Sequence, residues 1–284
     1  ANMSLNRISI WYRNDLRLQD HQPLSEALKL STQIIPIYCF DPRQFGKTVF
    51  GFPKTGAFRA QFLQESVADL RQSWRSLSLD LILRYGYPEE IIPQLALELG
   101  ISAVYYHREI TSEEVAVESA LKANLETIGI DMVPFWGRTL YHPDDLPFAI
   151  SELPELFTSF RKQVEKSVAI APNLPSSVIA RQKLKPLPDV EVGKLPQLSD
   201  FDLDTPVFDD RTVLKFQGGE TSGLARLQQY FWQQDRLRSY KETRNGMLGS
   251  DYSSKFSPWL AMGCLSPRYI YAQVQAYERE RVSN

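Results

Sequence analysis

The sequence predicts an α/β protein built on a parallel sheet, because short apolar segments alternate with longer amphipathic ones from Arg7 to Pro134. The apolar segments are rich in β-branched and aromatic residues and end at turn residues, as strands do. The expected strands are ISIWYR, IIPIYCF, LDLILRYG, AVYYH and DMVPFW, at residues 8–13, 34–40, 79–86, 103–107 and 131–136. Their nearly continuous apolar character favours a sheet covered on both faces.

The segments between these strands carry apolar residues at three- and four-residue spacing, which is typical of helices that cover a sheet. The expected helices are at residues 23–30, 55–77, 88–99 and 112–128. Beyond them the stretch LPELFTSFRKQVEKSV also has helical spacing. From 170 to 210 the composition changes to proline, lysine and short polar runs, which predicts a long connector between two domains.

A second, helical domain is expected to follow Gly218-Gly219-Glu220-Thr221, because Leu224, Leu227, Tyr230 and Phe231 then lie on one helix face. We therefore divide the chain into a Rossmann-like parallel α/β domain at 3–140, an inter-domain connector with a helix at 141–217, and the start of an all-helical domain at 218–284. The helical unit begins so near Asn284 that we expect it to be only partly present.

The composition is that of a globular protein, with 43% hydrophobic and 23% charged residues. No apolar run approaches the ~20 residues that span a bilayer, and the first residues lack signal-peptide features. We therefore expect a protein that contacts no membrane and stays inside a cell or organelle. We also expect it to be a monomer. Cys39 and Cys264 are expected to be buried free thiols, and the spacing of His21, His107 and His142 predicts no metal site.

The charge is uneven: residues 221–284 hold nine Lys/Arg against five Asp/Glu, or +4, which leaves −6 for the rest of a chain whose net charge is −2. This surplus alone is too small to decide between a solvated helix face and a nucleic-acid surface. Arg236, Arg238, Lys241 and Arg244 gather in the basic part and could face nucleic-acid phosphates.

Polar residues follow three of the expected strands, at 13–15, 40–42 and 107–109, and ligands of parallel sheets bind beyond such carboxyl ends. No GxGxxG or GxxxxGK[ST] motif lies in these turns, so a dinucleotide or P-loop site is not supported. Glu109 has two interpretations at this point. It is either a ligand-binding carboxylate or a solvated residue that a following helix start favours.

The stretch YKETRNGMLGSDYSSKFSPWLAMGCLSPR, from Tyr240 to Arg268, combines serines, a lysine and two Ser-Pro helix starts. Helix-start N–H groups, the Ser253 and Ser254 hydroxyls and the Lys255 ammonium form a donor set that suits phosphate oxygens. The alternative is that the serines only cap helices and Lys255 is exposed. No GxSxG elbow or other hydrolytic constellation accompanies this loop.

Three ordered motifs resemble the photolyase and cryptochrome flavoproteins: ISIWYRNDLRLQDHQPL, GGETSGLARLQQYFW and the serine-rich stretch. RTLYHPDDLPF, LPELFTSFRKQVEK and NGMLGSDYSSKFSPWL look most like the cryptochrome DASH branch. The resemblance covers essentially the whole chain. It implies a helical FAD-binding domain of which only part is present.

Site residues follow from this resemblance at matching positions. The FAD phosphate loop matches Ser253, Ser254, Lys255, Phe256 and Ser257, with Tyr240 as a preceding flavin contact. Arg244 matches an arginine that contacts DNA, and Glu109 matches the acidic residue that pairs with the pterin of an antenna folate, 5,10-methenyltetrahydrofolate. The tryptophans Trp11, Trp74, Trp136, Trp232 and Trp259 do not match the family's electron relay, and we expect them to be packing residues.

The implied activity is that of a deoxyribodipyrimidine photo-lyase, a carbon–carbon lyase that uses blue light and reduced FAD to split cyclobutane pyrimidine dimers, preferentially in single-stranded DNA. The alternatives are a cryptochrome blue-light photoreceptor that regulates gene expression, and a nucleotide-binding module without photochemistry. The catalytic cavity and electron-relay residues are expected beyond Asn284. We expect a cytoplasmic location in a prokaryote, and an organellar or nuclear location stays open.

Overall fold

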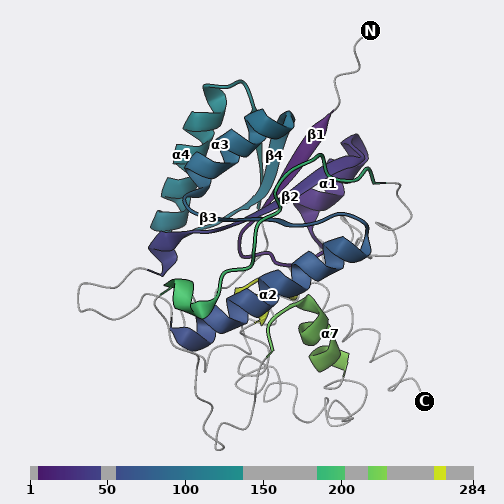
Figure 1. The fold of residues 1–284 in the computed structure, drawn as a ribbon, viewed down its shortest axis with the longest axis vertical. Helices are drawn as coiled ribbons and strands as arrows, with labels where there is room; N and C mark the ends of the chain where they lie inside the picture. Colours follow the sequence, from purple (N-terminus) through teal and green to yellow (C-terminus); the bar gives the residue numbers. More distant parts are fainter. Residues whose placement is uncertain (1–5, 46–55, 137–183, 202–216, 229–258, 267–284) are drawn as a thin grey trace, which may run out of the picture.

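The protein's fold is a parallel five-stranded sheet between two layers of helices (Figure 1). The computed structural model describes residues 6–45, 56–136, 184–201, 217–228 and 259–266. The strands are β1 (Arg7–Tyr12), β2 (Gln33–Phe40), β3 (Ile82–Tyr85), β4 (Ile101–Arg108) and β5 (Asp131–Trp136). They are parallel in the order β3-β2-β1-β4-β5, so the predicted fold class and all five predicted strands are confirmed.

Two helices cover each face of the sheet. The side chains of α1 (Gln22–Leu30) and α2 (Ala57–Ser76) pack with Ile8, Ile10 and Tyr12 of β1 in one core. The side chains of α3 (Pro88–Leu99) and α4 (Ser112–Glu126) pack with Trp11 and the alternate residues of β2 in the other. The central strands are therefore buried on both faces, as their continuous apolar sequence predicts.

The helix ends follow from local chemistry. His21 caps α1, because its side chain accepts a hydrogen bond from Leu24 N–H. Pro88 starts α3 where no intrahelical donor is needed, and Gly100 ends it in the left-handed conformation at φ +64°. Thr111 caps α4 by accepting a hydrogen bond from Glu114 N–H. These caps fix where each helix starts relative to the strand before it.

The order of the strands creates a crevice at the carboxyl edge of the sheet. The chain runs outward from β1 to β2 and β3 and then crosses back to β4 on the other side of β1. In open parallel sheets this reversal opens a crevice between the two strands concerned, and ligands bind there. Here the two strands are β1 and β4. The residues that come after them are Arg13 and Glu109.

The described part of the connector, residues 184–201, runs along the α/β domain and ends in the 3-10 turn η4 (Leu198–Phe201). Leu83 N–H of β3 donates to Val192 O at 2.8 Å, and Arg71 of α2 donates to the carbonyls of Val192 and Gly193. The connector thus covers the edge strand β3, whose unpaired groups would otherwise face water.

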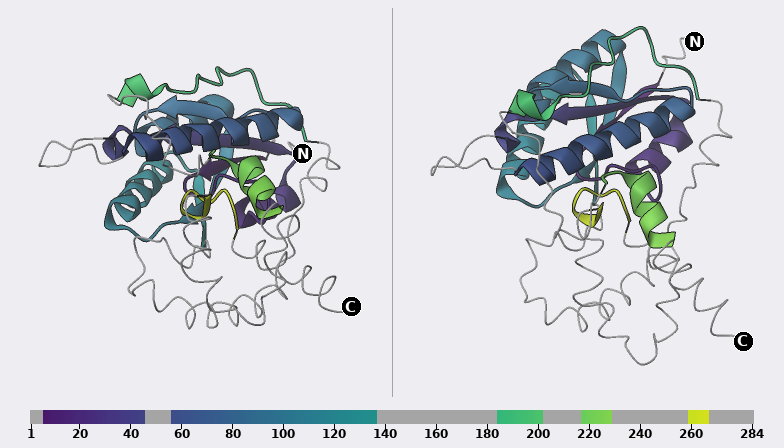
Figure 2. Two further views of the ribbon diagram at one scale, coloured as in Figure 1. Left: turned by 90° about the horizontal axis from the view of Figure 1, so that it is seen from below. Right: turned by 60° about the horizontal axis from the view of Figure 1, so that its bottom comes forward.

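Two segments from late in the sequence pack beneath α1 and α2, as both views of Figure 2 show. They are α7 (Glu220–Gln228) and residues 259–266, of which 259–261 are helical. Trp259 lies against Phe62 of α2 with ring centroids 5.8 Å apart, and its indole N–H donates to Gln217 O. The helix predicted after Gly219 is confirmed. The helix predicted at LPELFTSFRKQVEKSV lies outside the described residues, and the division into domains stays a prediction.

Most of the packing expectations hold. Cys39 and Cys264 are buried free thiols, and burial raises the pKa of both. Trp11, Trp74 and Trp259 are buried, but the interpretation of Trp136 as a packing residue is wrong. Trp136 ends the edge strand β5, is 64% exposed and carries the Arg108 guanidinium 5.1 Å above its ring. Within the described residues no helix combines the length and apolarity that a membrane crossing needs.

Candidate functional site

The carboxyl ends of β1 and β4 bring together two of the three polar clusters that the sequence singles out, residues 13–15 and 107–109. The third cluster stays apart from them. Asp41, after β2, caps a 3-10 turn (Pro42–Gln44) and forms an ion pair with Arg43, which also pairs with Glu89. The candidate site is therefore the crevice between β1 and β4.

Arg13 is the structural centre of this crevice. Its guanidinium lies 4.4 Å above the Trp11 ring and forms an ion pair with Glu118 of α4. It also donates to His107 O at 3.5 Å and to Glu114 O at 3.0 Å. The buried charge of Arg13 is thus neutralised, and its contacts tie β1, β4 and α4 together.

Glu109 lies at the end of β4 with its backbone N–H donating to Glu118 Oε1 at 2.8 Å. Burial and the nearby Glu114 carboxylate raise the pKa of Glu109 to about 8, although Arg13 and a hydrogen bond with Asn14 act in the opposite direction. The side chain is half-buried and lies two residues before Thr111, the N-cap of α4. Glu109 lies at the switch point of the sheet, which is the crevice between β1 and β4 where the strand order reverses. A carboxyl group with this pKa at such a point is a candidate ligand-binding group.

Asn14 and Glu114 form the rim beside Glu109. Asn14 Nδ2 donates to Glu114 Oε2 at 3.1 Å, and Thr111 Oγ1 donates to Glu114 Oε1 at 2.9 Å. Both oxygens of Glu114 are therefore engaged. Sequence reasoning missed this rim, although the Thr111-x-x-Glu114 spacing is a readable helix-start signal.

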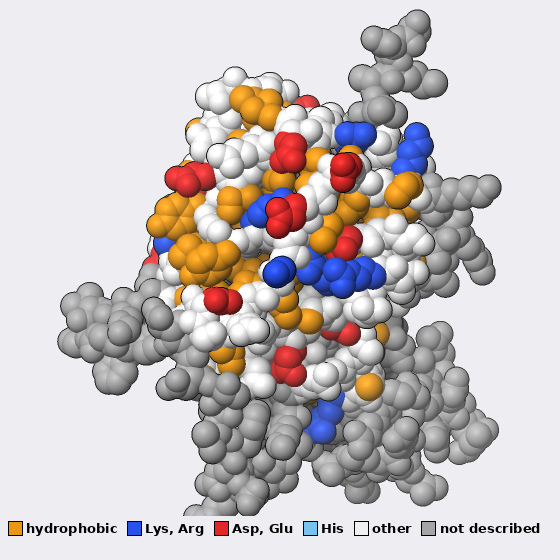
Figure 3. All heavy atoms as spheres, in the orientation of Figure 1, with side chains coloured by type: hydrophobic (Ala, Val, Ile, Leu, Met, Phe, Trp, Pro, Cys, Tyr) orange, Lys and Arg blue, Asp and Glu red, His pale blue; other side chains and the backbone are white. Residues whose placement is uncertain are grey.

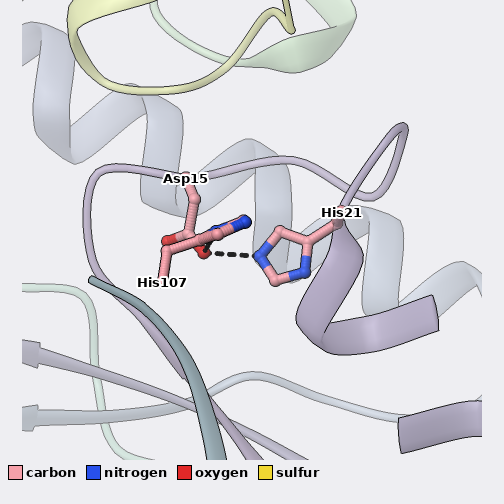
Figure 4. Close-up of side chains that lie close together, drawn as sticks. All are labelled: Asp15, His21 and His107. Atoms are coloured by element: carbon pink, nitrogen blue, oxygen red, sulfur yellow. Dashed lines mark hydrogen bonds and ion pairs between the residues drawn. The ribbon is translucent and has the colours of Figure 1, made fainter. Parts of the chain in front are cut away.

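Below the rim, Asp15 accepts hydrogen bonds from two histidines (Figure 4). His21 Nε2 lies 2.5 Å and His107 Nδ1 lies 2.7 Å from Asp15 Oδ2, and the backbone N–H of Arg13 donates to Oδ1. Burial alone would raise the pKa of Asp15, but attraction to His21 and the hydrogen bonds from both rings outweigh it and hold that pKa well below its usual range. Asp15 is a buried carboxylate.

His21 is neutral in this cluster, because burial lowers its pKa to about 4 despite the attraction of Asp15. Nδ1 of His21 accepts a hydrogen bond from the Leu24 N–H at the start of α1. The ring proton is therefore on Nε2, and this N–H donates a hydrogen bond to Asp15. Among the described residues, Asp15, His21 and His107 are the one group close enough to hold a metal ion. His21 can offer no free lone pair without giving up the helix cap, so we interpret the cluster as a hydrogen-bonded anchor for the loop after β1.

The same loop also contacts the late segments. Leu18 N–H and Gln19 N–H donate to the Glu220 carboxylate at 3.0 and 3.2 Å, and Leu16 N–H donates to Met262 O at 3.2 Å. Arg17 donates to Gly263 O at 3.0 Å. The loop after β1 therefore contacts the candidate site on one side and residues 259–266 on the other.

The other predicted site residues are not in the part of the chain that the structure describes. Tyr240, Arg244 and the serine-rich loop with Ser253, Ser254, Lys255, Phe256 and Ser257 lie outside it. Of the two Ser-Pro helix starts, Ser266 is described, and its hydroxyl hydrogen-bonds to the Asp20 carboxylate. On the face in Figure 3, acidic and basic side chains of the described residues are interspersed among apolar ones, so these residues form no broad basic surface there.

A doubly wound sheet with a half-buried carboxyl group at its switch point defines an α/β domain of the class that holds a small ligand between two strands. The chain belongs to the DNA photolyase family, whose sequence model matches residues 8–179. The resemblance that the sequence motifs indicate is thereby confirmed.

Its relatives narrow the branch. The chain is 61% identical over 282 residues to Cryptochrome DASH of Gloeobacter violaceus and 52% identical over 278 residues to that of Synechocystis, and these matches cover 99% and 98% of the chain. The solved structure of the Synechocystis cryptochrome matches with a TM-score of 0.80 at 51% identity over 100% of this chain. The chain is thus similar to the cryptochrome DASH branch throughout its length.

The chain spans little more than half of these proteins: 56% of each curated relative and 58% of the solved structure. The similarity therefore shows the fold and the family of this chain, but not the activity of the whole protein.

Proposed function

We propose that the protein is a blue-light-absorbing flavoprotein that binds FAD and repairs cyclobutane pyrimidine dimers, preferentially in single-stranded DNA, with a folate antenna at Glu109. Membership of the DNA photolyase family, together with 61% identity to a Cryptochrome DASH, supports this activity. The observation that carries the antenna is the raised-pKa carboxyl of Glu109 at the β1–β4 switch point.

The chemistry of Glu109 fits 5,10-methenyltetrahydrofolate. As a carboxylate it offers two acceptor oxygens to the ring and amino N–H groups of a pterin. Its desolvation makes those hydrogen bonds stronger than they would be in water. A bound folate would supply blue-light absorption and pass excitation energy on, while Glu109 itself binds and orients.

The FAD diphosphate is assigned to the serine-rich loop at 253–257, with Tyr240 as a further flavin contact. The free N–H groups of a helix start, the serine hydroxyls and Lys255 suit its phosphate oxygens. Support comes from the neighbouring segment, since residues 259–266 are anchored on α2 by Trp259 and on the loop after β1 by Gly263. Bound reduced FAD would supply the electron that splits the dimer.

DNA is assigned to the basic part of the chain, with Arg244 facing the lesion-bearing strand. A guanidinium can hold a phosphate through two parallel hydrogen bonds. The dimer has to leave the base stack before an electron can reach it, and this costs less in single-stranded DNA. That difference supports the preference for single strands.

The competing function is a blue-light photoreceptor that regulates gene expression with little or no repair. The relatives are named Cryptochrome DASH, and this name supports the photoreceptor alternative. Both functions need the same flavin, so flavin binding does not separate them. They differ in whether illumination leads to dimer splitting or to a regulatory signal.

The deciding experiment illuminates the reduced, flavin-containing full-length protein with a dimer-containing single strand and measures dimer loss by chromatography. We expect catalytic, light-dependent loss, with slower loss from the matched duplex. If dimers persist while the flavin is bound and reduced, the repair activity is excluded and the photoreceptor function takes its place. A colourless, flavin-free protein would instead favour a module without photochemistry.

A further inference from the structure

We propose that Glu118 of α4 is a positioning residue of the antenna site, which fixes the backbone from which the Glu109 side chain reaches into the crevice. Glu118 acts on the folate only through Glu109. This inference rests on the proposed folate site at Glu109. The sequence alone gives no sign of the role, because Glu118 is one of several glutamates in the same helix.

The first argument is the place of Glu109 just beyond the sheet. The pairing of β4 with β5 ends at Arg108, opposite Trp136, and its pairing with β1 ends at Tyr106. None of the described strands therefore fixes the backbone of Glu109. Its N–H donates instead to Glu118 Oε1 at 2.8 Å. This hydrogen bond satisfies a backbone donor and holds the peptide plane that precedes the Glu109 side chain.

The second argument is that the Glu118 carboxylate is itself held in place. Glu118 is buried, and the same oxygen that accepts the Glu109 N–H forms the ion pair with Arg13. The Arg13 guanidinium lies 4.4 Å above the Trp11 ring and donates to Glu114 O at 3.0 Å. Hydrogen bonds to a charged acceptor are the strong ones. Glu118 therefore offers Glu109 a fixed and charged acceptor.

The third argument is that the turn from β4 to α4 is held at its other end as well. Two residues after Glu109, the Thr111 side chain accepts the Glu114 N–H, and Thr111 O accepts the Val115 N–H. Glu109 thus lies between two fixed points, the Glu118 carboxylate and the cap of α4. Without the first, the Glu109 side chain would have to be ordered when a ligand binds, and this costs affinity.

The test compares two variants of the full-length protein that share Arg13→Met, so that neither leaves a buried charge unpaired. One adds Glu118→Leu, which removes the acceptor, and the other adds Glu118→Gln, which keeps an acceptor oxygen for the Glu109 N–H. The readouts are the Kd of 5,10-methenyltetrahydrofolate and the FAD content. We expect the leucine variant to bind folate about tenfold more weakly than the glutamine variant, with equal FAD content. Glu126→Gln, at an exposed position of α4, should bind like the wild type.

A third change separates this inference from the proposed function. In the Glu109→Gln background the leucine and glutamine variants should differ by less than about twofold, because Glu118 acts through the Glu109 carboxyl group. Equal folate affinities of the two variants with Glu109 present would overturn the positioning role. A joint loss of FAD and folate in the leucine variant would also overturn it, because Glu118 would then serve the whole fold. If Glu109→Gln alone leaves folate binding intact, the antenna site itself is wrong.

Discussion

The Glu220 carboxylate accepts a hydrogen bond from the backbone N–H of Leu18 at 3.0 Å, although 202 positions separate the two residues. It also accepts from Gln19 N–H, and at 8% exposure it has little contact with water. Burial raises the pKa of Glu220 to about 7, even though these hydrogen bonds and Arg17 favour the charged form. The contact joins the loop after β1 to the start of α7.

This contact predicts a pH-dependent stability. The folded pKa of Glu220, about 7, exceeds the usual unfolded value of about 4.3, so the folded state binds the proton more tightly. Its contribution is fully present below about pH 4.3 and is lost as the pH rises through 7, by at most about 4 kcal/mol. Denaturant unfolding between about pH 5 and 8 should show stability falling, and Glu220→Gln should flatten the slope.

The matched control is Glu98→Gln, because Glu98 is exposed on α3. This variant should keep the wild-type slope. A Glu220→Gln protein with an unchanged slope would show that Glu220 does not take up a proton in this range.

Replacing Gly263 by alanine, which adds one methyl group, should strongly lower the free energy of unfolding. Its φ is +64°, and an added Cβ would lie 1.9 Å from Asn14 O and 2.5 Å from Asp15 Cα, both backbone atoms that cannot yield easily. Gly129 has a similar φ of +72° but nothing within 4 Å of an added Cβ. Gly129→Ala should therefore cost about 1 kcal/mol, and Gly263→Ala at least about 2 kcal/mol more, by chemical denaturation. Equal losses would show that the close backbone contact is absent.

Replacing Asp15 by asparagine, which has almost the same shape, should strongly lower the free energy of unfolding. Asp15→Asn would replace one acceptor oxygen by a donor between two buried histidine N–H groups, which should cost about 3 kcal/mol of unfolding free energy. Glu26→Gln is a control, since Glu26 also carries a hydrogen-bonded carboxylate, but its ion pair with Lys29 is exposed. That change should cost less than about 1 kcal/mol by the same denaturation assay. Similar losses in the two variants would contradict the anchoring role of Asp15.

The raised pKa of Glu109 predicts that the affinity for folate depends on pH. The pterin N–H groups need a carboxylate, but below its pKa of about 8 Glu109 is increasingly protonated in the free protein. The apparent Kd should therefore rise as the pH falls from about 8 to 6, by up to about tenfold per pH unit. Glu109→Gln should bind weakly at every pH in a fluorescence titration. A wild-type Kd that stays constant over this range would rule out binding through the carboxylate.

The sheet could be predicted because its signals are local. The runs at 34–40 and 103–107 are apolar and β-branched or aromatic, and the helices between strands show clear three- and four-residue spacing. Trp136 was misinterpreted because an apolar strand residue does not reveal whether its strand lies at the sheet edge. Strand order decides that, and it depends on contacts far apart in the sequence.

The candidate site was predictable only in part, for the same reason. Glu109 follows from the resemblance and from its place after a strand, but Asn14, which hydrogen-bonds to Glu114 on the rim, lies 95 positions earlier, at the end of a strand that only the topology makes a neighbour. The Asp15–His107 contact likewise spans 92 positions. The serine-rich loop, Tyr240 and Arg244 lie outside the described residues and stay predictions.

The most direct test is an action spectrum of light-driven flavin reduction in the full-length protein loaded with FAD and folate. Our account predicts that the wild-type spectrum contains the folate absorption band and that the Glu109→Gln spectrum follows the flavin alone, with equal FAD content in both. A Glu109→Gln protein that keeps the folate band would contradict the assignment of the antenna to the β1–β4 crevice.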